Sequence, residues 1–202
     1  MAIFSLILFV LAGAGTPGPN NTITMASGAA YGFKRTLPAI LGVNIGFPVM
    51  LLLVGIGLGQ VLNQWPILDI LRPIGVLYLL YLAWKIATGP TDLSLKQSAK
   101  PPGFIQMALF QFVNPKAWTL AVAALSTFTG FWDSFLLEVV VMAVIFGVFS
   151  LPCTAAWTLL GVGAGRVMSK PRHMLIFNLV MAALLVVSVI PAIGATWRSL
   201  PF

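Results

Sequence analysis

Two short stretches of this chain carry residue types whose spacing could do chemistry. The first reads TPGPNN at residues 16–21, and the second reads FVNPKAW at residues 112–118. Proline interrupts a helix because it lacks an amide proton and clashes with the preceding turn. An interruption frees backbone carbonyls and presents the positive end of the half-helix that follows. Asn20 and Asn21 stand where such a half-helix would begin, so the first stretch predicts a binding site for a carboxylate.

Lys116 is the distinctive residue of the second stretch. It lies near the centre of a long apolar segment, where a charged side chain is costly and is usually paired or functional. No acidic residue lies at a similar depth, so we expect Lys116 to meet freed carbonyls or the carboxylate of a substrate. A lysine in an apolar pocket can also release its proton, which makes Lys116 a candidate proton carrier. The simpler alternatives are a kinked helix at TPGPNN and a lysine that snorkels to the interface.

The composition predicts the elements that position these residues. Of the 202 residues, 59% are hydrophobic and 7% are charged, whereas a soluble domain carries roughly a quarter charged residues. The apolar stretches do not alternate as barrel strands do, so they predict an all-α polytopic membrane protein. Six stretches are long enough to span a hydrocarbon core of about 30 Å. The predicted spans cover residues 3–27, 37–62, 66–87, 103–128, 135–163 and 173–197.

The single transmembrane domain, residues 1–202, divides into two halves of three spans, 1–87 and 103–202. A polar loop at 88–102 joins them. Thr16-Pro17 matches Asn114-Pro115, and Gly32-Phe33 matches Gly130-Phe131, both at an offset of 98 residues. The glycine clusters GIGLG and GVGAG also end corresponding spans, where we expect them to allow close helix packing. Because each half has an odd number of spans, the pattern predicts an inverted repeat whose first helix is interrupted by proline in both halves.

The distribution of lysine and arginine predicts the orientation. Eight basic residues fall on one side of the predicted spans: Lys34, Arg35, Lys85, Lys96, Lys100, Arg166, Lys170 and Arg172. The other side holds Arg72 and Arg198, together with Asp69, Asp133 and Glu138. Basic loops face the cytoplasm, so the loop 88–102 is predicted to be cytoplasmic. Both termini are then periplasmic in a bacterial inner (cytoplasmic) membrane.

Several classes of function lack the residues they need. The only cysteine is Cys153, and the only histidine, His173, lies in a predicted loop. This excludes a membrane cysteine pair, a thiolate metal cluster and a Ser–His protease, and no pair of aspartates lies within the spans. We therefore expect no enzyme, no metal and no cofactor. The net charge of +7 is explained by basic loops near anionic lipid, so no nucleic-acid partner is expected.

With these residues in view, the chain resembles the LysE/RhtB family of amino-acid exporters. The matching pieces are TPGPNN, YGFKR, GVNIG, GVLYLLYLAWKI, GFIQMALFQFVNPKAW and the final pair of apolar spans. The resemblance implies a secondary transporter that expels an amino acid by alternating access, using the proton gradient. It also implies that the site is lined by Pro17, Gly18, Pro19, Asn20, Asn114, Pro115 and Lys116. Asn21 and Asn44, a buried amide that could equally join helices, complete the predicted substrate-binding set.

The identity of the substrate and the route of the coupled proton are predicted less specifically than the lining of the site. Within the family, TPGPNN, LAWKIAT, FQFVN and ALSTF are most similar to exporters of cysteine and O-acetylserine. The lack of an acidic residue in the core favours a small neutral amino acid over a basic one. Export of homoserine, threonine or another amino acid remains an alternative, as does a membrane scaffold without transport. The candidate routes for the proton are Lys116, the boundary residue Glu138 and ordered water. The helix faces lined by small residues are compatible with a homo-oligomer.

Overall fold

The computed structural model describes residues 2–58, 67–89, 100–130, 132–167 and 171–198. These ranges hold eight α-helices, which confirms the all-α prediction. The helices are α1 (Ala2–Gly15), α2 (Pro19–Tyr31), α3 (Phe33–Leu53), α5 (Ile67–Ala87), α7 (Phe104–Phe110), α8 (Pro115–Phe128), α9 (Phe135–Val167) and α10 (Pro171–Arg198). A π-helical turn, η1 (Val54–Leu58), follows α3, and a 3-10 turn, η2 (Gln111–Val113), follows α7.

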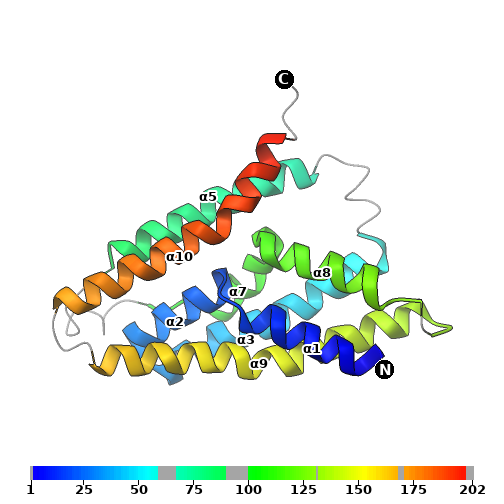
Figure 1. The fold of residues 1–202 in the computed structure, drawn as a ribbon, viewed down its shortest axis with the longest axis horizontal. Helices are drawn as coiled ribbons and strands as arrows, with labels where there is room; N and C mark the ends of the chain where they lie inside the picture. Colours follow the sequence, from blue (N-terminus) through cyan, green and yellow to red (C-terminus); the bar gives the residue numbers. More distant parts are fainter. Residues whose placement is uncertain (1, 59–66, 90–99, 131, 168–170, 199–202) are drawn as a thin grey trace.

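The chain runs back and forth along the long axis of the molecule (Figure 1). The predicted first and fourth spans are both broken at their prolines. The axes of α1 and α2 differ by 54° across the break at residues 16–18. Between α7 and α8, the backbone tightens into η2 and then leaves helical geometry at Asn114. In both breaks a proline occupies the start of the second half-helix, where its missing amide proton and fixed φ are tolerated.

Helix length supports part of the six-span prediction. Phe33–Gly57 and Phe135–Val167 are long and apolar enough to cross a membrane, and the bent pair Ile3–Gly15 with Pro19–Tyr31 makes a third candidate. Among the described residues, Val76–Ala87, Phe104–Val113 and Pro171–Val187 are shorter apolar helices. The remaining spans therefore stay a prediction. Most of the predicted loop 88–102 lies outside the described residues.

The connection between α2 and α3 is shorter than the sequence suggested. Lys34 and Arg35 were expected between spans, but they lie in the first turn of α3 because Gly32 alone separates the two helices. Gly32 has a φ of 80°, and Gly130, its predicted counterpart after α8, has a φ of 87°. Both values fall in the left-handed region that glycine adopts readily. In both predicted halves, a glycine with positive φ thus follows the broken first helix.

Helices at corresponding positions of the two halves pack against each other. α3 packs on α9 and α5 packs on α10, while α2 also lies along α9 (Figure 1). Small residues allow this approach: a Cβ added to Gly161 would collide with the backbone carbonyl of Met25, and one on Gly165 would lie 2.5 Å from that of Ala29. The prediction that the GVGAG cluster serves helix packing is therefore confirmed at these two positions.

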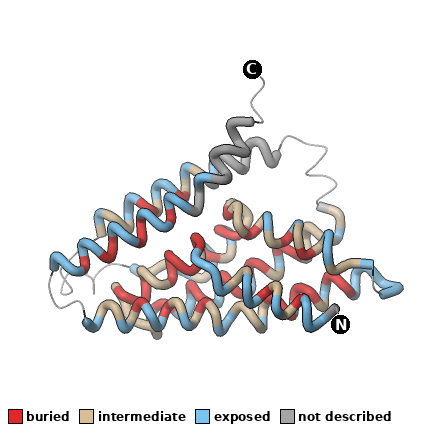
Figure 2. Tube along the Cα trace, in the orientation of Figure 1, coloured by how far each residue is buried: buried red, intermediate tan, exposed pale blue. Residues whose placement is uncertain are grey.

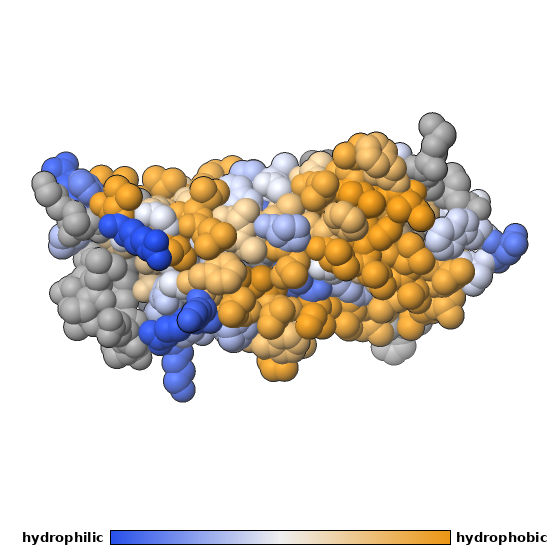
Figure 3. Space-filling view, turned by 90° about the horizontal axis from the view of Figure 1, so that it is seen from below, coloured by the Kyte–Doolittle hydropathy of each residue, from blue (hydrophilic) through white to orange (hydrophobic). Residues whose placement is uncertain are grey.

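The surface and interior follow the division expected for a protein surrounded by lipid. Buried positions face the helix contacts, and exposed positions run along the outside of each helix (Figure 2). Large apolar side chains such as Leu77, Ile105 and Val144 are more than half exposed. Figure 3 shows a mainly hydrophobic face with hydrophilic side chains gathered toward the ends of the long axis. Such a surface suits contact with hydrocarbon along the length of the helices.

Candidate functional site

The break between α1 and α2 leaves backbone carbonyls without helical partners, and side chains satisfy them. Asn21 Nδ2 donates to the carbonyls of Ala14 at 2.7 Å and Thr16 at 2.9 Å. The indole nitrogen of Trp157, on α9, donates to the carbonyl of Gly15 at 3.1 Å. Because these carbonyls have no helical partner at the break, the side-chain donors replace the missing backbone hydrogen bonds. Asn21, predicted as a substrate ligand, thus holds the shape of the break.

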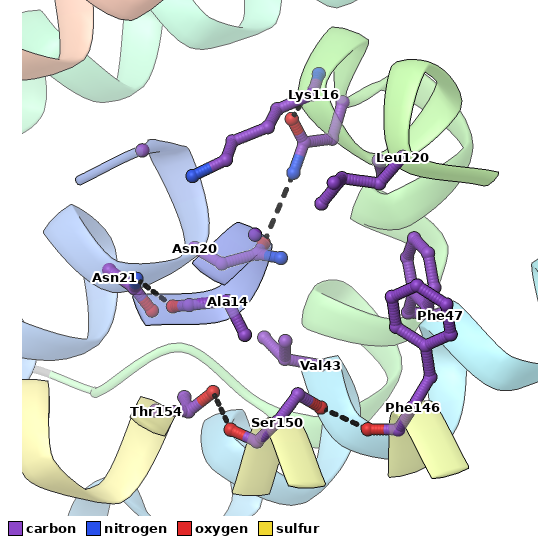
Figure 4. Close-up of a pocket in the computed structure, with 14 residues that line it drawn as sticks. Ala14, Asn20, Asn21, Val43, Phe47, Lys116, Leu120, Phe146, Ser150 and Thr154 are labelled. Carbon is purple, nitrogen blue, oxygen red and sulfur yellow. Dashed lines mark hydrogen bonds between the residues drawn. The ribbon is translucent and has the colours of Figure 1, made fainter. Parts of the chain in front are cut away.

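Lys116 reaches from the start of α8 to the same break (Figure 4). Its Nζ donates to Thr16 Oγ1 at 2.8 Å, to the Thr16 carbonyl at 3.0 Å and to the Pro17 carbonyl at 3.1 Å. An ammonium group has three N–H donors, so these three acceptors match its full capacity. One of the two partners expected for Lys116, the freed carbonyls, is therefore present. The bonds also join the broken helix of one half to that of the other.

Gly18 makes room for the lysine. A Cβ at Gly18 would lie 2.7 Å from Lys116 Cδ and 2.9 Å from its Nζ. The backbone of Gly18 is fully extended, with a φ of 177°, so space rather than conformation favours glycine here. Pro17 is exposed and contributes its carbonyl, and Pro19 is buried at the start of α2.

Asn114 organises the second break. Its Oδ1 accepts a hydrogen bond from the Lys116 backbone amide at 3.1 Å, which caps α8, and Pro115 takes the first helical position. Its Nδ2 donates to Asn20 Oδ1 at 3.3 Å. Asn114 therefore links the two breaks through its side chain, whereas Pro115 acts through the backbone by starting α8.

Asn20 and Gln111 form a reciprocal amide pair between the halves. Asn20 Nδ2 donates to Gln111 Oε1 at 2.9 Å, and Gln111 Nε2 donates to Asn20 Oδ1 at 3.0 Å. Gln111 is fully buried and also donates to the Met107 carbonyl. The sequence reasoning did not include Gln111 in the site. The available signal was an amide in an apolar span, five residues before Lys116.

A small cavity of about 50 Å³ adjoins these groups (Figure 4). Its lining residues with polar side chains are Asn20, Asn21, Asn114, Lys116, Ser150 and Thr154, and the backbone of Gly18 also lines it. Its apolar lining residues are Gly13, Ala14, Val43, Phe47, Ala117, Leu120 and Phe146. No carboxylate is among these described lining residues, so Lys116 carries the charge of the site. Ser150 and Thr154 had not been predicted; they are ordinary hydroxyl residues of a long apolar helix and carry no local signal.

Five predicted residues lie outside this lining: Pro17, Pro19, Pro115, Asn44 and Glu138. The three prolines border the helix breaks, whereas Asn44 and Glu138 make hydrogen bonds elsewhere. Asn44 accepts a hydrogen bond from Ser150 Oγ at 2.6 Å and donates to the Ile40 carbonyl at 2.8 Å, so it joins α3 to α9 behind the cavity wall. Glu138 accepts from the backbone amides of Gly130 at 2.9 Å and Trp132 at 2.8 Å. It lies beyond the opposite end of α8 from Lys116, and 14 residues of helix span about 20 Å. Its carboxylate therefore holds the turn before α9.

The site has the chemistry of a binding site for a small molecule with a carboxylate. Within the described ranges, no three His, Cys, Asp or Glu side chains lie together as metal ligands would. The groups that could bind such a molecule are one ammonium, three amides, two hydroxyls and the amino end of α2. The N-cap residue of α2 is Gly18, so no side chain caps this helix end. All of them meet where two interrupted helices face each other.

The sequence of the chain is similar to those of known translocators and efflux proteins. The sequence profile of the LysE type translocators matches residues 11–190. The cysteine/O-acetylserine efflux protein of Escherichia coli (strain K12) is 35% identical over 179 residues, 88% of this chain and 90% of that protein. The protein of the same name from Salmonella paratyphi A (strain ATCC 9150 / SARB42) is 38% identical over 129 residues, 63% of this chain and 66% of that protein. No solved structure matches the chain. The match over most of the chain confirms that this is a membrane transporter rather than an enzyme, and the chain belongs to the LysE-type translocator family.

Proposed function

We propose that this protein exports a small neutral amino acid or derivative, of the cysteine and O-acetylserine type, across a bacterial inner membrane. The observation that carries the proposal is the meeting of two broken helices at one cavity, with Lys116 of one half bound to the backbone of the other. Helices interrupted at corresponding positions are typical of substrate sites in secondary transporters. The relatives named for cysteine and O-acetylserine efflux support the substrate class.

The carboxylate of the substrate binds at Lys116 and at the amino end of α2. It replaces the carbonyls of Thr16 and Pro17 as acceptor for the ammonium, and the uncapped end of α2 favours its negative charge. The side chain of the substrate then faces Val43 and Phe47. A small apolar, thiol or ester group suits this wall, and a cationic side chain would find no carboxylate among the described lining residues.

The topology proposed for this exporter is an inverted repeat of six spans. The packing of α3 on α9 and of α5 on α10 supports it, as do the matched glycines at 32 and 130. Lys34 and Arg35 lie in the first turn of α3 and Arg166 lies in the last turn of α9. These two helix ends are at the same end of the molecule (Figure 1). We place that end in the cytoplasm, which puts both termini on the periplasmic side.

Export is coupled to proton entry by alternating access. Lys116 is the group best placed to couple the two steps, because it touches both halves and the cavity. Glu138 is the other candidate from the sequence, and its place at the far end of α8 would require a second step to link it to the substrate. Oligomerisation is not needed for this mechanism.

Efflux from intact cells tests the proposal. Cells expressing the chain would be loaded with labelled cysteine, O-acetylserine, threonine, homoserine, leucine or lysine, and efflux followed with and without a protonophore. We expect faster efflux of cysteine or O-acetylserine than in vector-only cells, and loss of the difference when the gradient collapses. Unchanged efflux of all six compounds, from protein shown to be inserted, would contradict the proposal.

A further inference from the structure

A second and larger cavity lies between α2, α5, α7 and α10. Its volume is about 440 Å³, within the range of cavities that hold small molecules. We call it the basic vestibule and define it by Ser27, Tyr31, Lys85, Lys100, Gln106 and Asn178, which contribute its polar lining. Lys85 ends α5 and Lys100 precedes α7, so the basic vestibule belongs to the end of the molecule that we place in the cytoplasm.

The basic vestibule and the smaller cavity beside Lys116, which we call the central cavity, are both lined by residues of α2. Asn20 lines the central cavity, while Ile23 and Ser27 line the basic vestibule. Residues spaced by three and four positions share one face of a helix. On the other side, Gln106 lines the basic vestibule and Gln111 pairs with Asn20. The Asn20–Gln111 pair therefore lies between the linings of the two cavities along α2.

The chemistry of the basic vestibule selects an anionic group. Two lysines line it, and no carboxylate is among its described lining residues. The ammonium of Lys85 lies 5.6 Å from the centre of the Tyr81 ring, a cation–π contact that restricts its position. A concave surface with charge of one sign raises the local concentration of the opposite charge. Carboxylates and lipid phosphates share this chemistry, but the volume of the cavity and its place on the α2 face that also carries Asn20 favour a small soluble carboxylate.

We propose that the basic vestibule is the cytoplasmic loading site of the exporter. Lys85 and Lys100 hold the α-carboxylate of the substrate there. The Asn20–Gln111 pair then separates, and the carboxylate passes to Lys116. This inference rests on the proposed export function and adds a second binding site to it, outside the two helix breaks.

Transport kinetics in inside-out membrane vesicles test the loading site, because the cytoplasmic face is then outside. Initial uptake of O-acetyl-L-serine would be measured against its concentration for the wild type, Lys85→Gln, Lys100→Gln and the double variant. We expect the half-saturating concentration to rise roughly twofold to fivefold for each exposed lysine, and about tenfold for both, with the maximal rate unchanged. Added salt should raise this concentration in the wild type and change it little in the double variant.

Lys34→Gln is the matched control, because Lys34 is a basic residue near the same end but does not line the cavity. Equal half-saturating concentrations in the wild type and double variant would overturn the inference, as would a shift of the same size in Lys34→Gln. A shift confined to right-side-out vesicles would also overturn it. Proteoliposomes of zwitterionic phosphatidylcholine alone, which contain no lipid of net negative charge, separate the two anions. A shift that disappears there assigns the lysines to anionic lipid headgroups and overturns the loading site. Failure of wild-type uptake would instead refute the proposed function, on which the inference rests.

Discussion

Replacing Gly18 by alanine tests whether the position of Lys116 matters for transport. The added Cβ would lie 2.7 Å from Lys116 Cδ, while ordinary van der Waals contact begins at 3.4 Å, so the lysine must move by about 0.7 Å. A shift of that size along a hydrogen bond of 3.0 Å, such as the one to the Thr16 carbonyl, would stretch it beyond bonding distance. The extended backbone of Gly18 accepts alanine without strain, so the substitution acts through this contact.

The expected loss follows from the bonds that the lysine makes. A hydrogen bond to a charged group contributes about 1.5–3 kcal/mol, and about 1.4 kcal/mol corresponds to a factor of ten in rate or affinity. The displaced ammonium would also lose one hydrogen bond to the carboxylate that replaces these carbonyls in the proposed mechanism, so transport should fall by roughly tenfold to 150-fold. The assay is proton-driven uptake of O-acetyl-L-serine into inside-out vesicles, normalised to the amount of inserted protein.

Gly15→Ala is the control from the same break. A Cβ at Gly15 meets no atom within 4 Å, and alanine is favoured over glycine in a helix. We expect this variant to transport like the wild type. If Gly18→Ala also transports like the wild type, the contact between Gly18 and Lys116 is not part of the transport site, and the reasoning from the break to the substrate fails.

Three further predictions, the last with its control variant, distinguish residues needed for transport from residues needed for stability. Lys116→Met should reduce transport more than about 100-fold, because it removes the charge and the three bonds together; membrane fractionation should show the variant inserted, and retained transport would remove Lys116 from the mechanism. Glu138→Gln should lower the free energy of unfolding by about 1–3 kcal/mol, because it weakens the bonds to Gly130 and Trp132. Its transport rate per inserted molecule should stay within about twofold of the wild type. If transport by this variant no longer depended on the proton gradient, Glu138 would instead be the coupling group. Gly161→Ala should lower the melting temperature in detergent because its Cβ meets the Met25 carbonyl, whereas Gly163→Ala should leave it unchanged, since a Cβ there meets no atom within 4 Å. Equal melting temperatures of the two glycine variants would contradict the packing role.

Properties that depend on neighbours in the sequence could be predicted from it. The positions of both breaks followed from proline, because its effect on a helix is local. The bounds of α5, predicted as residues 66–87, followed from hydropathy, since an apolar stretch inside lipid must satisfy its own backbone. The second span, predicted as 37–62, was placed too far along the chain, because α3 covers Phe33–Leu53. The short turn at Gly32 was missed because two adjacent basic residues suggested a loop, although a charged first turn of a helix at the membrane surface is equally polar.

Properties that depend on tertiary contacts could not be predicted. Asn20, Asn21 and Asn44 are the same side chain in similar surroundings, yet one pairs with Gln111, one holds α1 to α2 and one joins α3 to α9. The partner of Asn20 is 91 residues away along the chain. Glu138 caps a turn whose shape depends on the positive φ of Gly130. An amide or carboxylate in an apolar span therefore predicts that a polar contact exists there, but how the helices pack decides which group is its partner.

The arrangement at Lys116 connects binding with movement of the two halves. Its ammonium joins α8 to the broken helix α1–α2, and the same ammonium is the positive side chain of the central cavity. A carboxylate that binds it must compete with the Thr16 and Pro17 carbonyls for the same three N–H donors. Substrate binding thus weakens a contact between the halves, and it does so without leaving the charge unpaired in the membrane. A ligand can shift a conformational equilibrium only through such a difference in contacts between two states. In the proposed mechanism, the group that recognises the carboxylate is also the group that holds the halves together, so their relative movement depends on the presence of substrate.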